Sequence, residues 1–361
     1  MPCERVLAIV KTVLGMEEVA ASVIEETVGV RCVAKPNGYP GIVLVCGDGE
    51  RSEVVDRIRS EVPEAERVIP VEEWVPSDIE SIVEAAKRVV DGRIGADESF
   101  AVRTVRRGRR GYTSVDVNIR AGAAVKEVTG ASVNLRYPDK IVQVEILGDH
   151  AAVSLLDGRM EWRKLRPGKP AVLDFIRKVA VAHIPYLGPP NASREMGVRV
   201  GREAQTFEVK ELVVTPVGLV DANGLRHFLN GVFEGVRSRF EIQRRAYGRD
   251  VHRVPVYLQD IYGFVRERRR EPIIVFEPEG EPVPKVADEI YKLLQARRRV
   301  NVMVGSREGI PKGVFRFSNL VLDICPGVTI STDYAASSAL IALANTIEWK
   351  LLEVGGEENL R

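Results

Sequence analysis

The stretch that decides the fold is VNVMVGSREGIP, residues 300–311, with LVLDICPGVT, residues 320–329, and ISTDYAASSALIALANTIEW, residues 330–349. The first two segments are short apolar runs that end in loops rich in Gly and Pro. The third is an Ala-rich pattern typical of a helix. Open α/β sheets place ligands at loops of this kind, at the carboxyl ends of buried strands. We therefore expect a cofactor pocket here.

An earlier loop has the same character. FEPEG, residues 276–280, begins at the last residue of the apolar run PIIVF, residues 272–276. Glycine lets the backbone approach a ligand closely, and proline fixes the shape of a loop before the ligand arrives. Each loop by itself is compatible with an ordinary turn. Three such loops on neighbouring parallel strands predict one shared pocket.

The rest of the second half alternates strand and helix signals. VAVAHIPYLG, residues 179–188, predicts a buried strand that runs into a Gly-Pro-Pro loop before a helix. Two basic stretches follow, and each is compatible with a solvated helix face paired with Glu or with RNA contact. They contain Arg237, Arg239, Arg244, Arg245 and Arg249, and then Arg266, Arg268, Arg269 and Arg270.

The first half has a different pattern. Residues 4–74 read strand-helix-strand-strand-helix-strand, the ferredoxin-like order, with AERVIPVEEWV, residues 65–75, as the closing strand. An amphipathic helix is expected from Ser77 to Val90. The next strand enters a dense cluster of cations, which favours either a phosphate-binding surface or a solvated basic hairpin. The cluster contains Arg103, Arg106, Arg107, Arg109 and Arg110.

Composition limits the class of protein. The chain has 361 residues, 45% hydrophobic and 29% charged, with a net charge of +1, which predicts a globular protein of more than one domain. Its cysteines, Cys3, Cys32, Cys46 and Cys325, have no CxxC spacing, so we expect free thiols and no metal site. Neither a signal peptide nor a membrane-spanning run is apparent, which predicts a cytoplasmic protein.

Residues 77–156 resemble the THUMP domain of tRNA-modifying enzymes. The resemblance rests on SFAVR at 99–103, RRGRRGYTS at 106–114 and VNLRYPD at 133–139. It extends to the helix with Ile119, Gly122 and Val125 and to the strand with Val142, Val144 and Ile146. THUMP domains dock the acceptor end of tRNA, so the resemblance implies RNA contacts by the arginines of the cluster and by Lys126. Tyr112 is open to either base stacking or a core role.

Residues 178–352 resemble the SPOUT methyltransferases, chiefly through GSREGIP and the loop before the last helix. The resemblance implies an α/β sheet tied in a trefoil knot, S-adenosylmethionine held by three loops, and a homodimer. The implied cofactor-binding residues lie in these loops: Phe276, Glu277, Pro278, Gly280, Gly305, Ser306, Gly309, Ile310, Ile324, Pro326, Gly327, Val328 and Thr329.

Catalytic residues are implied at the start of the first helix of this domain. Ribose-methylating SPOUT enzymes use an Asn and an Arg there, which points to Asn191 and Arg202, with Arg194 and Arg199 as rivals. Arginine stays charged, so it suits phosphate or alkoxide better than the role of a base. Glu308 is the more conventional base and also suits methylation of a nucleobase nitrogen.

We therefore expect a mixed α/β and α+β protein: a ferredoxin-like domain at 1–75, a THUMP domain at 76–157, a linker at 158–177 and a SPOUT domain at 178–361. Its expected activity is S-adenosylmethionine-dependent methylation of tRNA, first at a ribose 2′-hydroxyl near the acceptor stem. The alternatives are base N-methylation and a non-catalytic RNA-binding protein with a degenerate cofactor site. Rossmann methyltransferases and zinc deaminases are disfavoured because their motifs are missing.

Overall fold

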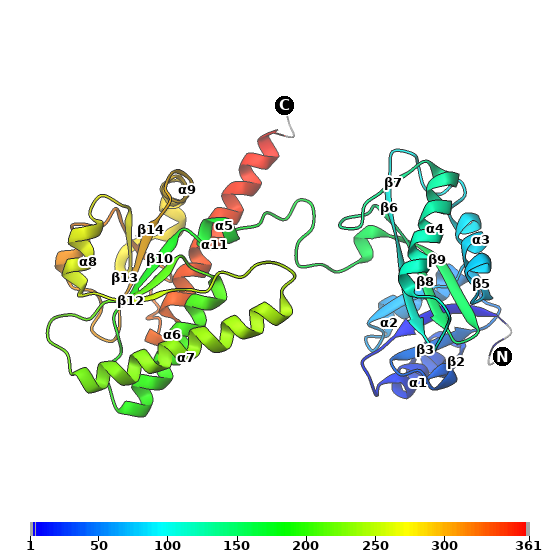
Figure 1. Cartoon of the computed structure of the whole chain (residues 1–361), viewed down its shortest axis with the longest axis horizontal. Coiled ribbons are helices and arrows are strands. Elements are labelled where there is room, and N and C mark those ends of the chain that lie inside the picture. The colour runs from blue at the N-terminus through cyan, green and yellow to red at the C-terminus, as the bar shows by residue number, and fades with distance from the viewer. Residues whose placement is uncertain (1–2, 4, 359–361) are drawn as a thin grey trace. The chain divides into compact units, whose positions relative to one another are not determined.

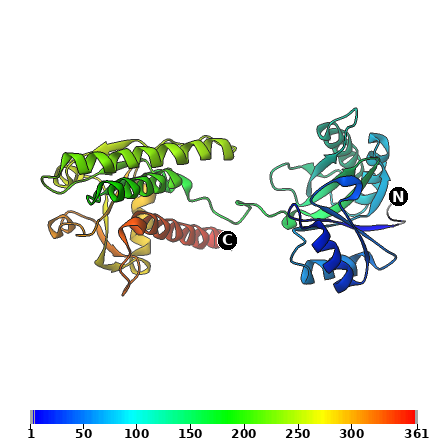
Figure 2. The same ribbon diagram turned by 90° about the horizontal axis from the view of Figure 1, so that it is seen from below.

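The computed structural model describes residue 3 and residues 5–358. The chain divides into two compact units, Met1–Arg166 and Pro167–Arg361, named unit 1 and unit 2 below. Figures 1 and 2 show unit 1 in blue to green and unit 2 in green to red. Among the described residues, no helix combines the length and the apolar character needed to cross a membrane.

Unit 1 begins with a βαββαβ sheet. Its strand order is β2-β3-β1-β4 with antiparallel neighbours, which confirms the ferredoxin-like arrangement. Helices α1 and α2 cover one face, where Ile24 and Ile58 are fully buried. The elements are β1 (Val6–Lys11), α1 (Glu17–Val28), β2 (Arg31–Ala34), η1 (Pro36–Gly38), β3 (Ile42–Cys46), α2 (Arg51–Glu61) and β4 (Arg67–Pro70).

A second sheet completes unit 1, with the strand order β5-β9-β8-β6-β7. Helices α3 and α4 pack on one face, and Asp78 caps α3 by accepting a hydrogen bond from Ser81 N at 2.8 Å. The elements are β5 (Glu73–Pro76), α3 (Ile79–Val90), β6 (Ser99–Arg107), α4 (Ser114–Thr129), β7 (Ser132–Val133), β8 (Lys140–Leu147), β9 (His150–Asp157) and η2 (Gly158–Met160).

The two sheets of unit 1 share an apolar layer in which Ile9 and Ile69 meet Leu147. This layer explains why the expected single strand at 65–75 is wrong. Val71 N donates to Leu7 O, whereas Glu72 N donates to Val153 O. The chain therefore changes sheets between these two residues, and the segment forms β4 and β5.

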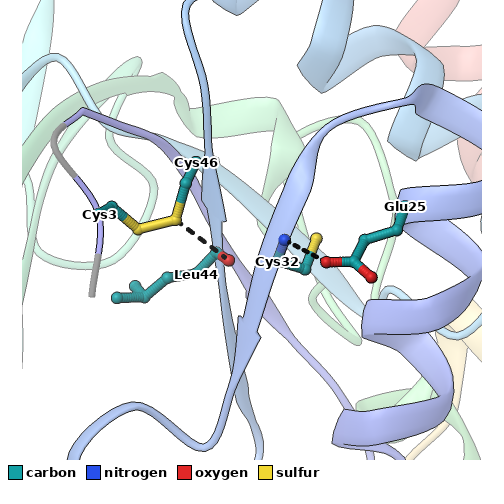
Figure 3. Close-up of a disulfide and its surroundings, with 5 residues drawn as sticks. All are labelled: Cys3, Glu25, Cys32, Leu44 and Cys46. Atoms are coloured by element: carbon teal, nitrogen blue, oxygen red, sulfur yellow. Dashed lines mark hydrogen bonds between the residues drawn. A yellow bond between two sulfur atoms is a disulfide. The ribbon is translucent and has the colours of Figure 1, made fainter.

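The expectation of free thiols is wrong for two cysteines. Cys3 and Cys46 form a disulfide that joins the start of the chain to β3 (Figure 3). Cys32 and Cys325 are free, and burial raises the pKa of the Cys32 thiol to about 12. The pairing depends on β1 and β3 being neighbours, which brings together residues 43 positions apart.

Unit 2 contains a parallel sheet with the strand order β12-β11-β10-β14-β13-β15. Its elements are α5 (Leu173–Ile176), β10 (Val179–His183), α6 (Pro190–Phe207), β11 (Glu211–Val214), α7 (Ala222–Ala246), β12 (Val256–Leu258), α8 (Ile261–Arg268), β13 (Ile273–Pro282), η3 (Val283–Val286), α9 (Ala287–Ala296), β14 (Val300–Val304), α10 (Lys312–Phe315), β15 (Leu320–Asp323) and α11 (Thr332–Glu358).

Helices cover both faces of this sheet. Helices α6, α7, α9 and α11 share one core, to which Phe228 and Leu340 belong. Helices α8 and α10 share the other, to which Phe264 and Val314 belong. A sheet buried on both faces explains why its strands are apolar throughout.

Helices α6 and α7 run side by side in close contact (Figure 2). A Cβ added at Gly197 or Gly201 would collide with the backbone of α7, and one added at Gly231 or Gly235 would collide with that of α6. The glycines therefore allow the two helix backbones to touch.

Strand β13 is longer than the apolar run that predicted it. Phe276 pairs with Leu322 of β15, and Glu281 pairs with the same residue after a shift in register. A Cβ at Gly280 would meet the backbone of Leu322. The segment 276–282 thus passes around the end of β15 instead of leaving the sheet as a simple loop. The last helix, α11, extends beyond the helical pattern expected at residues 330–349 and ends at Glu358.

Candidate functional site

A pocket lies at the carboxyl-terminal edge of the unit 2 sheet, where β13, β14 and β15 end. It is an open hollow of about 530 Å³, a volume that includes the solvent at its mouth. The three expected loops all contribute, and the first turn of α11 closes one side. The lining residues are Phe276, Glu277, Pro278, Gly305, Ser306, Leu322, Asp323, Ile324, Val328, Ile330, Thr332 and Ala335.

Glu277 joins two of the loops. Its Oε1 accepts a hydrogen bond from Ile310 N at 2.6 Å. A Cβ at Gly305 would lie 2.6 Å from the same oxygen, and Gly309 has a φ of +69° that favours glycine. Burial raises the pKa of Glu277 above its usual value. The glycines therefore create the space that the half-buried carboxylate occupies.

The loop after β15 forms the apolar wall of the pocket. Asp323 Oδ1 accepts from Cys325 N at 2.9 Å, and Val328 N closes a turn onto Cys325 O at 2.9 Å. Gly327 has a φ of +84° within this turn. These local hydrogen bonds fix the loop so that Ile324 and Val328 face the pocket.

Charged groups of α6 meet the start of α11 beside the pocket. Arg199 Nη1 donates to Asp333 Oδ2 at 2.6 Å, and Ser331 Oγ donates to Asp333 Oδ1 at 2.6 Å. Burial raises the pKa of Glu203, one turn further along α6, to about 7, against hydrogen bonds from Ser337. Asp333 directly follows Thr332, which lines the pocket.

The expected catalytic residues are not brought together. Arg202 donates to Ser238 Oγ of α7 at 3.0 Å and does not line the pocket. Asn191 lies exposed in the first turn of α6, which begins at Pro190. Glu308 is exposed in the loop after β14. The rival Arg194 pairs with Glu234.

The expected cofactor residues lie partly in the pocket. Of the first loop, Phe276, Glu277 and Pro278 line it, while Gly280 backs onto β15. Of the other loops, lining residues are Gly305, Ser306, Ile324 and Val328. Gly309 and Ile310 support Glu277 from behind. Pro326, Gly327 and Thr329 belong to the loop after β15 and do not line the pocket.

Sequence reasoning missed part of the pocket: Leu322, Asp323, Ile330, Thr332 and Ala335. Leu322 and Asp323 lie in the strand that feeds the third loop, and the other three lie after that loop. The loop motifs drew attention only to the residues between the strand and the helix. The sequence could have identified them, because ligands in open α/β sheets bind just outside the carboxyl ends of the strands, where a strand ends and the next helix begins.

Most of the basic cluster of unit 1 has internal partners. Arg103 donates to Leu135 O at 2.6 Å, and Arg107 donates to the buried Glu145 at 2.9 Å. Arg106 donates to Arg110 O at 3.3 Å and also to Tyr112 O, and Arg110 pairs with Asp149. Arg109 and Lys126 are exposed.

Tyr112 has a structural position. Its hydroxyl donates to Ser77 O, and its ring packs against the core beneath α3 and α4. Of the two roles that the sequence left open, the structure supports the one in the core. Among the described residues, no group of His, Cys, Asp and Glu side chains is arranged to hold a metal ion.

Two models of known protein families match this chain, one in each unit. A family model described as AF2226-like SPOUT RNA methylase fused to THUMP matches residues 173–359, and a THUMP domain model matches residues 76–156. An uncharacterised protein of Methanocaldococcus jannaschii is 38% identical over 353 residues, which cover 97% of this chain and 96% of that protein.

Other similarities are local or weak. A tRNA sulfurtransferase of Proteus mirabilis is 30% identical over 112 residues, 31% of this chain and 23% of that protein. The crystal structure of TrmN from Thermus thermophilus is 15% identical, with a TM-score of 0.35, over 87% of this chain and 92% of that one. A similarity this weak does not indicate a shared function.

Proposed function

The chain belongs to the family of SPOUT RNA methylases fused to a THUMP domain, and we propose that it methylates tRNA with S-adenosylmethionine as the donor. The observation that carries the proposal is the pocket around Glu277. It combines a half-buried carboxylate with apolar walls at the ends of three parallel strands. The same chain carries a domain of the kind that docks tRNA.

The pocket residues fit this donor. Phe276, Leu322, Ile324 and Val328 offer apolar surface for a purine. No cation pairs with Glu277 among the described residues, and burial raises the pKa of its carboxyl. A ligand that brings a hydroxyl or a positive charge would satisfy the free oxygen. When bound, the donor would supply a methyl group on a positively charged sulfur.

We propose a ribose 2′-hydroxyl in or near the acceptor stem as the acceptor, with a base nitrogen as the alternative. The chain must then align the acceptor oxygen with the methyl carbon and accept the hydroxyl proton. The proposed residues are Arg202, Asn191 and Glu308. Arg202 and Asn191 lie on α6 and do not line the pocket of their own subunit, so we propose that they act at the pocket of a second subunit.

A homodimer through unit 2 is therefore part of the proposal. Helix α11 exposes apolar side chains along its length, including Tyr334, Ile341 and Trp349. Exposed apolar patches of this kind mark interaction sites. A partner that covers α11 would also approach Arg199 and Asp333 at the start of this helix.

We also propose that the chain is knotted in unit 2. The pairing of Phe276 and Glu281 with the same residue of β15 supports this proposal, as does the contact of Gly280 with the backbone of Leu322. The expected domain limits, a cytoplasmic location and RNA contacts by the basic cluster and Lys126 remain proposals. Within the basic cluster, Arg109 is the side chain most accessible to a phosphate.

Calorimetry with S-adenosylmethionine tests the cofactor. We expect saturable heat for the native chain and weaker binding for Glu277→Gln. Absence of heat with the native chain would support the non-catalytic alternative.

Mass spectrometry of nucleosides from treated tRNA tests the acceptor. A methyl group on the ribose fragment supports the proposal, whereas a methyl group on the base fragment supports the alternative. Unchanged tRNA in the presence of bound donor contradicts both.

A further inference from the structure

A basic surface covers the amino-terminal edge of the unit 2 sheet, opposite the pocket. It comes from the segments that precede β10, β11, β13 and β14, which a parallel sheet brings to one edge. Two open concavities of about 580 and 660 Å³ lie there and share Lys210. We name this the basal surface and define it by Arg177, Lys210, Arg270, Arg297, Arg298 and Arg299.

Nearby carboxylates are paired with arginines, and two of these arginines, Arg177 and Arg299, belong to the basal surface. Glu211 and Glu271 each lie within ion-pair distance of both Arg268 and Arg299. Glu208 contacts Arg177 and Arg249. Glu211 and Glu271 share the same two arginines, so these four charges balance, whereas Glu208 faces two positive charges and leaves one of them over.

The pKa of Glu208 reflects this surplus. Burial raises it, yet hydrogen bonds from Arg249 and Arg177 outweigh burial and lower the pKa to about 2. Asp250 is the exposed carboxylate that lines one concavity without such a pair among the described residues. It offsets only part of the positive charge.

Several cations of the basal surface have no partner. Within residues 5–358, the charged groups of Lys210, Arg270, Arg297 and Arg298 make no ion pair or hydrogen bond to a side chain. The three arginines are exposed, and Lys210 is half-buried. Guanidinium groups held this close repel one another unless an anion or solvent takes up the charge. The whole chain carries only +1, so this density is local.

We propose that the basal surface binds the phosphate backbone of the same tRNA that unit 2 methylates, an inference that rests on the proposed function. Strand β14 spans five residues, so the surface lies about 15 Å from the pocket at the other end of the strands. It therefore holds a different part of the RNA from the nucleotide that enters the pocket.

An RNA fits this surface better than a membrane does. The concavities are lined almost entirely by charged residues, with Pro272 and Val251 as the apolar exceptions. Surfaces that bind lipid also present aromatic or long aliphatic side chains for insertion. Phosphate contacts of this type add affinity and orientation without reading sequence.

The test compares two charge-matched double variants of the full chain. Arg297→Gln with Arg298→Gln removes two charges of the basal surface. The control, Arg226→Gln with Lys292→Gln, removes two exposed charges from α7 and α9 that line neither concavity nor pocket. Binding of unfractionated tRNA is measured as a function of salt, with S-adenosylmethionine binding measured in parallel.

We expect the basal variant to bind tRNA about tenfold more weakly at low salt, with a salt slope smaller by about 1 to 2. The control should bind within about twofold of the native chain, because isolated solvated charges contribute little. Binding of S-adenosylmethionine should not change in either variant. The inference is overturned if the basal variant matches the control.

Other outcomes separate the inference from the proposed function. A native chain that binds tRNA without methylating it, and loses affinity in the basal variant, overturns the function and supports the inference. A native chain that does not bind tRNA overturns the inference. Binding to anionic phospholipid vesicles that is lost in the basal variant, without a change in tRNA affinity, also overturns it and assigns the surface to a membrane.

Discussion

Glu277 Oε1 accepts a hydrogen bond of 2.6 Å from the backbone N–H of Ile310, which ties the end of β13 to the loop after β14. The loop can approach so closely because Gly305 and Gly309 have no side chains. One carboxylate therefore shapes two sides of the pocket and leaves its second oxygen available to a ligand.

Glu277→Gln keeps an acceptor for Ile310 N but removes the negative charge. We expect affinity for S-adenosylmethionine to fall about tenfold, the scale of one hydrogen bond to a charged group. The raised pKa of Glu277 predicts that native affinity weakens as acid protonates the carboxyl, whereas the variant is less sensitive. Calorimetry across a pH series measures both effects. Equal pH dependence in the two proteins would contradict the role of Glu277.

Arg202→Ala and Arg199→Ala test the catalytic arginine. If Arg202 acts on the acceptor, its loss should lower kcat/KM by about 10²-fold and leave donor binding intact. Arg199 pairs with Asp333 beside the pocket, so its loss should also disturb the first turn of α11. Single-turnover methylation assays distinguish the two. Full activity of Arg202→Ala would remove it from the proposed site.

Glu203→Gln should stabilise unit 2 above neutral pH. The folded-state pKa of about 7 lies above the ordinary 4.5, so ionisation opposes folding, and stability falls as pH rises from 4.5 to 7. We expect the substitution to raise the free energy of unfolding by about 1 to 2 kcal/mol, less than the full pKa shift implies because the carboxyl is partly exposed to solvent. Urea unfolding on both sides of this range measures it. A variant less stable than the native chain at high pH would show that the buried charge is compensated.

His183 should make unit 2 sensitive to acid. Burial beside Phe228 lowers its pKa from 6.5 to about 4, against a hydrogen bond to Ile184 O. The unfolded state therefore binds the proton first, and stability is lost as pH falls from 6.5 to 4. The full loss amounts to about 3 kcal/mol. His183→Gln should flatten this part of the stability profile and lower stability at neutral pH through imperfect packing beside Phe228.

Gly201→Ala should destabilise unit 2 by more than about 2 kcal/mol, because the new methyl group would meet the backbone of Val232 on α7. Gly122→Ala on α4 is the matched control. Its nearest neighbour would be Val102 Cγ2 at 3.8 Å, so higher helix propensity should stabilise unit 1 by up to about 1 kcal/mol. Thermal unfolding with hydrogen exchange resolves the two units. Equal effects would contradict the close contact of α6 and α7.

The periodicity of the sequence identified most elements of both units. Alternating and helical patterns are local, so the βαββαβ order and the loops after the parallel strands could be predicted from the sequence alone. The prediction of a single strand at residues 65–75 was wrong because the apolar pattern continues through a point where the backbone changes its hydrogen-bond partner from β1 to β9. The length of β13 could not be predicted because the second half of this strand is polar and is held in the sheet by its pairing with β15.

The sequence by itself determined the class of each domain and the loops that form the pocket, because strand patterns and Gly-Pro loops are properties of neighbouring residues. Only the tertiary structure decided that Glu277 supports the loop at Ile310 and that Cys3 meets Cys46. It also decided that Lys210, Arg270 and Arg297 share one surface. These relationships join segments far apart in the chain, which come together only when the strands adopt their order in the sheet.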